Sequence, residues 1–273
     1  MPRFRLTIEY AGTRYSGWQI QKNARTVQGE LERAIRGVSP RQPFEFYGAG
    51  RTDAGVHALA QVAHLELYTQ LGPEQLRRRI NDDLPADIHV RTIDKAPHRF
   101  HARHDAVSRS YLYQISRRRT AFGKPYVWWI REPLDLDRMR EAAGAFAGMK
   151  DFREFTDDDP GEKSTVVLVE RFEIVDRDPL ILIRIQGSHF LWKMVRRMVG
   201  VLAAIGRGES SPERVADLVR LKPDTTSENR ATGVDPTIDV AALTAPAAGL
   251  FLEGVYYHGE PGPGPVRPVF NLD

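Results

Sequence analysis

The chain has 273 residues, of which 41% are hydrophobic and 27% charged, proportions typical of a folded globular protein with one large domain or two modest ones. It contains no run of eighteen apolar residues, which excludes an α-helical membrane span. It also contains no cysteine, which excludes disulfides and thiolate metal sites and favours a reducing cytoplasm, and its net charge is only +3.

The first hundred residues alternate between strand-like and helix-like patterns. Apolar and polar side chains alternate over residues 4–10, which predicts a half-buried strand. Apolar residues recur at helical spacing from Val27, and Pro73 suits the first turn of a second helix. Further strands are predicted at 44–48, 61–67, 88–94 and 99–104. The order β-α-β-β-α-β favours a ferredoxin-like sheet with its helices on one face.

A similar succession of elements begins near residue 108. The expected elements are a strand at 109–116, a helix at 135–147, strands at 165–175 and 180–186, a long helix at 189–205, a short helix from Ser211, and a strand at 250–257. Residues 222–248 are expected to form a long loop. The sequence thus predicts an α+β protein of two ferredoxin-like (RRM-like) subdomains, residues 1–105 and 106–273, with mainly antiparallel sheets and an active-site cleft between them.

The basic residues are mostly arginines, 32 Arg against 7 Lys, and they cluster in the sequence at 77–79, 98–104, 116–119 and 193–197. Arg suits bidentate contact with phosphate, so this segregation favours a nucleic-acid surface. In the predicted long helix, Lys193, Arg196 and Arg197 recur on the face opposite the apolar one, and no acidic residue at helical spacing compensates them. A solvated face and a polyanion site are both compatible with this pattern.

Several chemistries find no support in the motifs. The chain has no Walker-type phosphate loop and no HExxH segment, and its histidines lack metal-ligand spacing. The stretch "GAGRTDAG" at 48–55 has the spacing G-x-G-x-x-x-x-G and precedes a predicted strand, so it is not a dinucleotide-binding fingerprint.

The same loop nevertheless carries the best candidate for chemistry, Asp53. The commoner role of such an Asp is to close a turn. Against that, Arg51 is not needed for a turn, and three glycines allow a ligand to approach the backbone closely. A carboxylate beside fixed cations stays ionised and can act as a nucleophile or a base. Tyr111, with Arg109 nearby, is either a half-buried strand aromatic or a stacking surface for an extruded base.

Seven segments, in order along the chain, together resemble the tRNA pseudouridine synthase A family and span nearly the whole chain. They are "EYAGTRYSGWQ" (9–19), "TVQGELERA" (26–34), "GAGRTDAGVHALAQVAHLEL" (48–67), "NDDLPADI" (81–88), "FHARHDAVSRSYLYQI" (100–115), "FLWKMVRRMVG" (190–200) and "APAAGLFLEGVYY" (245–257). "GSHFLW" departs from the family, which usually has an Asn-bearing segment before this helix.

The resemblance implies a role for individual residues. Asp53 is the expected catalytic nucleophile, Arg51 the residue that helps displace and hold the flipped nucleotide, and Tyr111 the side chain that packs against the target base. Arg196 is expected to pair with the catalytic Asp, and Leu250 and Leu252 to lie near the pocket. Phosphate contacts are expected from the basic clusters, namely Arg77, Arg78, Arg79, Arg109, Lys193 and Arg197.

The implied activity is the isomerisation of uridine to pseudouridine at positions 38, 39 and 40 of the tRNA anticodon stem-loop, by a cytoplasmic homodimer that needs no cofactor and acts on a flipped base. A non-catalytic RNA-binding module or tRNA chaperone is the competing hypothesis. A metal-dependent nuclease is disfavoured because no carboxylate cluster stands at metal-ligand spacing.

Overall fold

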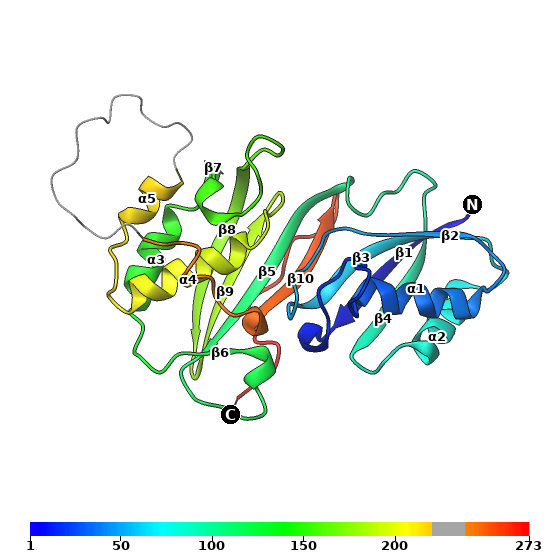
Figure 1. Ribbon diagram of the computed structural model, residues 1–273, viewed down its shortest axis with the longest axis horizontal. Coiled ribbons are helices and arrows are strands. Elements are labelled where there is room, and N and C mark those ends of the chain that lie inside the picture. The colour runs from blue at the N-terminus through cyan, green and yellow to red at the C-terminus, as the bar shows by residue number, and fades with distance from the viewer. Residues whose placement is uncertain (220–237, 273) are drawn as a thin grey trace. The chain divides into compact units, whose positions relative to one another are not determined.

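The computed structural model describes residues 1–219 and 238–272, and its strands form a large, mostly antiparallel sheet (Figure 1). The chain makes two compact units: unit 1 is Met1–Leu112 with Ala247–Pro265, and unit 2 is Tyr113–Pro246 with Val266–Asp273. The mixed α and β composition predicted from the sequence is therefore confirmed, whereas the ferredoxin-like character of each half stays a prediction.

The return of the chain to unit 1 differs from the single boundary expected near residue 105. Its cause is the last strand, β10 (Leu250–Tyr257), which pairs in parallel with β3 (His57–Leu67) through Phe251 opposite His57 and Leu252 opposite Ala58. Parallel pairing between segments so far apart in sequence leaves no local signal in the residues themselves.

Unit 1 is built around β3. Strand β1 (Arg3–Tyr10) runs antiparallel along one edge of β3, and β4 (Ile88–Ala96) continues the sheet beyond β1. The other edge of β3 receives β10 at its start and β2 (Phe44–Gly48) at its end. In the sheet order, β10 is followed by β5 (Ala106–Ser116).

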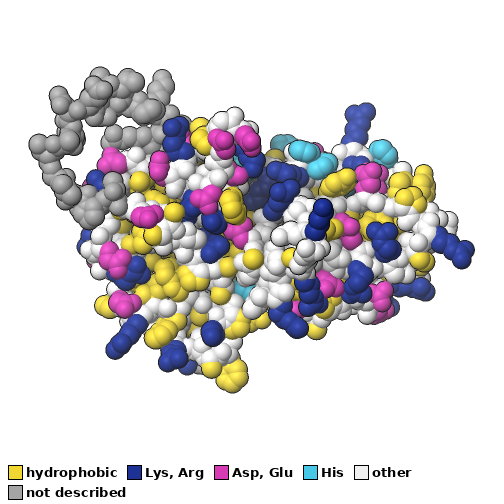
Figure 2. All heavy atoms as spheres, in the orientation of Figure 1, with side chains coloured by type: hydrophobic (Ala, Val, Ile, Leu, Met, Phe, Trp, Pro, Cys, Tyr) yellow, Lys and Arg dark blue, Asp and Glu magenta, His cyan; other side chains and the backbone are white. Residues whose placement is uncertain are grey.

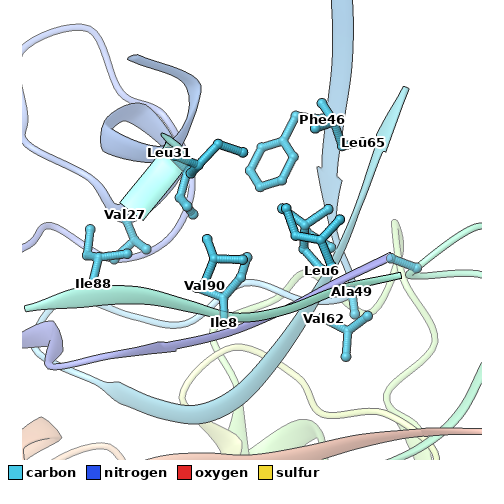
Figure 3. Packing of buried hydrophobic residues seen from close by; sticks show 14 of the residues in the cluster. Leu6, Ile8, Val27, Leu31, Phe46, Ala49, Val62, Leu65, Ile88 and Val90 are labelled. Atoms are coloured by element: carbon cyan, nitrogen blue, oxygen red, sulfur yellow. The ribbon is translucent and has the colours of Figure 1, made fainter. Parts of the chain in front are cut away.

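Helices α1 (Val27–Val38) and α2 (Pro73–Asp83) pack against each other in unit 1, and α2 also packs against β4. The hydroxyl of Thr26 caps α1 by accepting a hydrogen bond from the Gly29 N–H at 3.2 Å. Inward-facing residues of the strands and of α1 meet in a core that includes Leu6, Ile8, Val27, Leu31, Phe46, Leu65 and Val90 (Figure 3).

Residues 99–104 are not the strand that the sequence predicts. Their main-chain groups form turns and side-chain contacts instead: the Phe100 N–H donates to Pro97 O at 2.9 Å, and the Ala102 N–H donates to His64 Nδ1 at 3.1 Å. These hydrogen bonds take the place of those that a neighbouring strand would supply. Strand β4 therefore ends at Ala96 and β5 begins at Ala106.

The strands of unit 2 follow one another in the sheet order β5-β9-β8-β7, with β6 beside β5. The strands are β6 (Trp128–Trp129), β7 (Gly148–Asp151), β8 (Val166–Arg177) and β9 (Leu180–Gly187); the helices are α3 (Leu136–Gly144), α4 (Met194–Gly206) and α5 (Arg214–Leu218). Short 3-10 helices occupy Gly12–Arg14 and Ala247–Gly249 in unit 1, and Lys124–Tyr126 and Arg153–Phe155 in unit 2.

The long helix of unit 2 starts later than predicted. Lys193 has a φ of +62°, in the left-handed region, so α4 begins at Met194 instead of residue 189. Most of the predicted loop at 222–248 lies outside the described residues, and residues 238–246 are irregular and turn-forming. Within residues 1–219 and 238–272, no helix has the length and apolar character needed to cross a bilayer.

Candidate active site

The loop that carries Asp53 fills a gap along one edge of β3. The chain leaves β2 at Gly48 beside Ala63 and re-enters the sheet at His57, where β10 pairs. Within the loop, the Ala49 N–H donates to Val62 O at 2.7 Å and Gln61 Nε2 donates to Gly50 O at 3.0 Å. Ala49 is itself part of the hydrophobic core (Figure 3), so the loop is anchored to the sheet before it reaches the acid.

Asp53 stands at the first position of a tight turn. The Val56 N–H donates to Asp53 O at 3.2 Å, and Gly55 adopts a φ of +79°. The turn is closed by the main-chain carbonyl, a group that every residue has, so the turn does not require an Asp at this position. The side chain of Asp53 is half-buried. A turn role and a chemical role are therefore compatible in one residue.

A second segment, residues 11–18, braces this loop from the side. The Trp18 N–H donates to Thr52 O at 3.0 Å, and the Gly55 N–H donates to Tyr15 O at 3.3 Å. Gly17 has a φ of +89°, and a Cβ there would lie 2.6 Å from Thr52 O. The sequence motifs at 9–19 and 48–67 thus form one structure, in which the first segment positions the turn of the second.

Two buried tyrosines connect this bracing to the rest of unit 1. The hydroxyl of Tyr10 is 2.8 Å from Thr52 Oγ1, next to Asp53 in the chain, and burial raises the pKa of Tyr10 above its ordinary value. The hydroxyl of Tyr15 donates to the carboxylate of Asp87, within the motif at 81–88. Sequence reasoning assigned no site role to either tyrosine, although both lie in the motif at 9–19.

Tyr111 is brought close to Asp53 by β5. Burial raises the pKa of the Tyr111 phenol, the negative charge of Asp53 raises it further, and Arg109 opposes the shift. The hydroxyl is therefore neutral at physiological pH. Tyr111 also packs against the core of unit 1, as expected for a half-buried strand aromatic, whereas its stacking on a base stays a prediction.

The segment from Ala247 to Leu252 passes beside the turn. A Cβ added to Gly55 would lie 3.2 Å from the Cβ of Ala247. Leu250 and Leu252 are both buried, and Leu252 belongs to the core cluster of unit 1. The structure therefore places Asp53, Tyr111, Leu250 and Leu252 in one unit, with the two leucines beneath the surface.

The two arginines predicted near this loop differ in their surroundings. Arg51 is exposed. Arg109 is partly buried, and its guanidinium donates to Ala106 O and Arg103 O at 2.9 Å and to Ala49 O at 3.4 Å. Burial lowers the pKa of Arg109. These contacts connect the start of the Asp53 loop to the segment before β5, which is a structural role in addition to any contact with phosphate.

In unit 2, the three cations around the start of α4 do not form the uncompensated stripe that the sequence suggested. Arg197 is buried, and Asp157 accepts hydrogen bonds from Arg197 and, at 2.9 Å, from Lys193 Nζ. Asp157, the acid that compensates these cations, lies in a loop, so residue spacing within the helix could not predict the pairing. Arg196 is half-buried, and its Nε donates to Ala245 O at 2.7 Å.

The arginines of α2 lie on the surface of unit 1. Arg77 and Arg78 pair with Glu74 at 2.8 and 2.9 Å, and Arg79 is exposed. The hydrogen bond from Arg77, followed by that from Arg78, lowers the pKa of Glu74. Across residues 1–219 and 238–272, no group of three His, Asp or Glu side chains is placed to hold a metal ion.

Comparison with known proteins identifies the family of this chain. A family model described as "tRNA pseudouridine synthase" matches residues 6–105 and 142–258, which include the Asp53 loop, its bracing segment and β10. The chain belongs to the tRNA pseudouridine synthase family. Members of this family are isomerases that convert uridine to pseudouridine in tRNA.

The relatives support the same assignment over most of the chain. The chain is 38% identical to the tRNA pseudouridine synthase A of Pseudothermotoga lettingae over 258 residues, covering 93% of this chain and 99% of the relative. It is 42% identical to that of Rhodopseudomonas palustris over 219 residues, with coverages of 79% and 89%. The enzyme of Geobacillus kaustophilus is 36% identical, with coverages of 94% and 95%.

Proposed function

We propose that this pseudouridine synthase acts on uridines 38, 39 and 40 of the tRNA anticodon stem-loop, with Asp53 as the nucleophile. The observation that supports the choice of Asp53 is its setting. A half-buried carboxylate sits on a turn that is held from two sides, by Trp18 and Tyr15, next to the neutral ring of Tyr111. Residues held this firmly supply the positional accuracy that a reacting group needs.

The reaction breaks the N1–C1′ bond of uridine, rotates the uracil and forms a C5–C1′ bond. The C5 proton is released to solvent and N1 takes up a proton from solvent, so the product is an isomer of the substrate. A paired uridine cannot reach a protein carboxylate, so the nucleotide is flipped out of the stack. Asp53 then acts on the ribose, either by attacking C1′ or by removing the C2′ proton. Tyr111 packs against the flipped base, and because its hydroxyl stays neutral it places no second negative charge beside Asp53.

The remaining roles follow the family resemblance. Arg51, exposed two residues before Asp53, helps to displace and hold the flipped nucleotide. Arg196 is the proposed cationic partner of Asp53. The exposed residues of the basic clusters contact phosphates, a set that no longer includes Arg197, which is buried against Asp157. A homodimer in the cytoplasm is the proposed working form.

The test is tritium release from tRNA labelled at C5 of uridine. An Asp53→Asn variant is expected to lose activity completely and to retain tRNA affinity, because the amide keeps the shape of the side chain but is not a nucleophile. Asp94→Asn, which changes an exposed carboxylate on β4 of the same unit, serves as the matched control and is expected to be fully active. Full activity of Asp53→Asn would refute the assignment.

An assay of the wild-type protein is enough to distinguish the proposed enzyme from the competing hypothesis, a non-catalytic RNA-binding module. It predicts salt-sensitive tRNA binding with no tritium release. Carbodiimide-block primer extension on the treated tRNA then locates each new pseudouridine, and modification outside 38–40 would contradict the proposed positions while leaving the reaction intact.

A further inference from the structure

Unit 2 presents two large aromatic side chains to solvent within one short segment, residues 116–131. Phe122 is 96% exposed and Trp129, on β6, is 41% exposed. Exposed aromatic rings are typical of a binding surface, because burying each ring against a partner removes a large apolar area from water. The segment lies outside the two stretches that match the family model, 6–105 and 142–258.

The loop that carries Phe122 is firmly held. The Gly123 N–H donates to Thr120 Oγ1 at 3.0 Å, and the Tyr126 N–H donates to Gly123 O at 2.8 Å. A Cβ on Gly123 would lie 2.9 Å from Thr120 Cγ2 and 3.1 Å from Leu272 Cδ2, so the loop packs tightly on the C-terminal segment. Phe122 is thus presented by a pre-organised loop, which lowers the entropic cost of binding.

The segment that carries the two rings is itself rich in basic residues. Residues 116–131 contain five cations, Arg117, Arg118, Arg119, Lys124 and Arg131, and no carboxylate. Arg117 forms ion pairs with Asp176 at 2.6 Å and with Asp178 at 3.4 Å. The guanidinium of Arg119 lies 5.5 Å from the ring centroid of Trp129. Figure 2 shows hydrophobic and basic side chains interspersed in the part of the molecule that Figure 1 labels β6.

We infer that this surface, made by Arg119, Phe122, Lys124, Trp129 and Arg131, binds unpaired nucleotides of RNA. Aromatic rings stack on bases, and interleaved cations contact the phosphates between them. A second copy of this chain would bring the same positive charges against themselves, which disfavours self-association through this surface. The inference rests on the proposed function in one respect: the bound RNA is the tRNA substrate. The bases that bind this surface are unpaired bases of that tRNA other than the reacting uridine.

The experiment measures tRNA affinity in an Asp53→Asn background, so that binding is observed without turnover. Phe122→Ser and Arg119→Gln are compared with Met149→Ser, a control on β7 that removes another exposed apolar side chain of unit 2. Fluorescence anisotropy gives the Kd for a labelled tRNA transcript and for a fully paired RNA duplex, each over a series of salt concentrations. Because Phe122 is 96% exposed, its replacement leaves the packing of the fold unchanged.

Phe122→Ser is expected to raise the Kd for tRNA about tenfold, to leave the duplex Kd unchanged, and to keep the salt dependence of the wild type. Arg119→Gln is expected to weaken both probes and to reduce the slope of log K against log salt by about 0.7. Met149→Ser should bind as the wild type does.

An unchanged tRNA Kd for Phe122→Ser, or an equal loss on tRNA and duplex, would overturn the inference. A sedimentation coefficient that falls for Phe122→Ser without loss of tRNA affinity would overturn it in favour of a protein partner. Failure of the wild type to release tritium would count against the proposed function alone, since the binding data do not depend on turnover.

Discussion

Gly50 is the glycine of the Asp53 loop that the fold itself does not require. A Cβ on Gly48 would lie 2.7 Å from the indole of Trp18, and Gly55 has a φ of +79°. At Gly50, by contrast, a Cβ would meet no heavy atom of residues 1–219 and 238–272 within 4 Å beyond its own chain neighbours, and φ is not positive. Because Gly50 is three residues before Asp53, we predict that its missing side chain makes room for the RNA.

Gly50→Ala should therefore separate stability from activity. The free energy of unfolding is expected to stay level or to rise by about 0.4–1 kcal/mol, because Ala restricts the unfolded chain more than Gly does. A methyl group forced into a close contact costs about 1–3 kcal/mol. If the methyl group meets the bound RNA in this way, kcat/KM is expected to fall by about fivefold or more.

Urea unfolding and tritium release at low tRNA concentration measure the two quantities. Gly144→Ala is the matched control, because in the part of the chain that the structure describes a Cβ at this position, at the end of α3, also meets no heavy atom within 4 Å outside its own helix and chain neighbours. It should keep the wild-type kcat/KM. If Gly50→Ala keeps kcat/KM within about twofold of wild type, the RNA does not approach this stretch of backbone and the reasoning is refuted.

Two further predictions concern the support of the site. Tyr10→Phe removes the hydroxyl that contacts Thr52, so it should lower the free energy of unfolding by about 1 kcal/mol and reduce kcat. Urea unfolding and tritium release measure the two effects, and wild-type values in both would contradict the prediction. Burial, then the positive charges of His101 and Arg3, lower the pKa of His64 from 6.5 to about 4. The stability that His64 contributes is therefore complete above about pH 6.5 and is lost as the pH falls towards 4, by about 2 kcal/mol between pH 7 and 5. Urea unfolding at both pH values should show a smaller difference for His64→Asn, and equal differences would exclude His64 as the cause.

Local pattern was sufficient to predict most helices and strands. Strict alternation predicted β1, and helical spacing with a suitable first turn predicted α1 and α2. The glycine-rich loop with Arg51 made Asp53 a candidate, but its composition alone fits a turn equally well, and the resemblance to the family was needed to favour the catalytic role. These signals are carried by residues close together in the chain, so one sequence contains them.

Contacts between distant segments were decided only by the tertiary structure. Asp157 neutralises Lys193 and Arg197 from a loop some forty positions earlier, and no periodicity within a helix encodes that pairing. The bracing of Asp53 by Tyr15 and Trp18 likewise depends on how two loops meet. Composition and spacing thus determined which residues could react, whereas long-range packing decided which of them are held in place, because the free energy of packing depends on every neighbour in space.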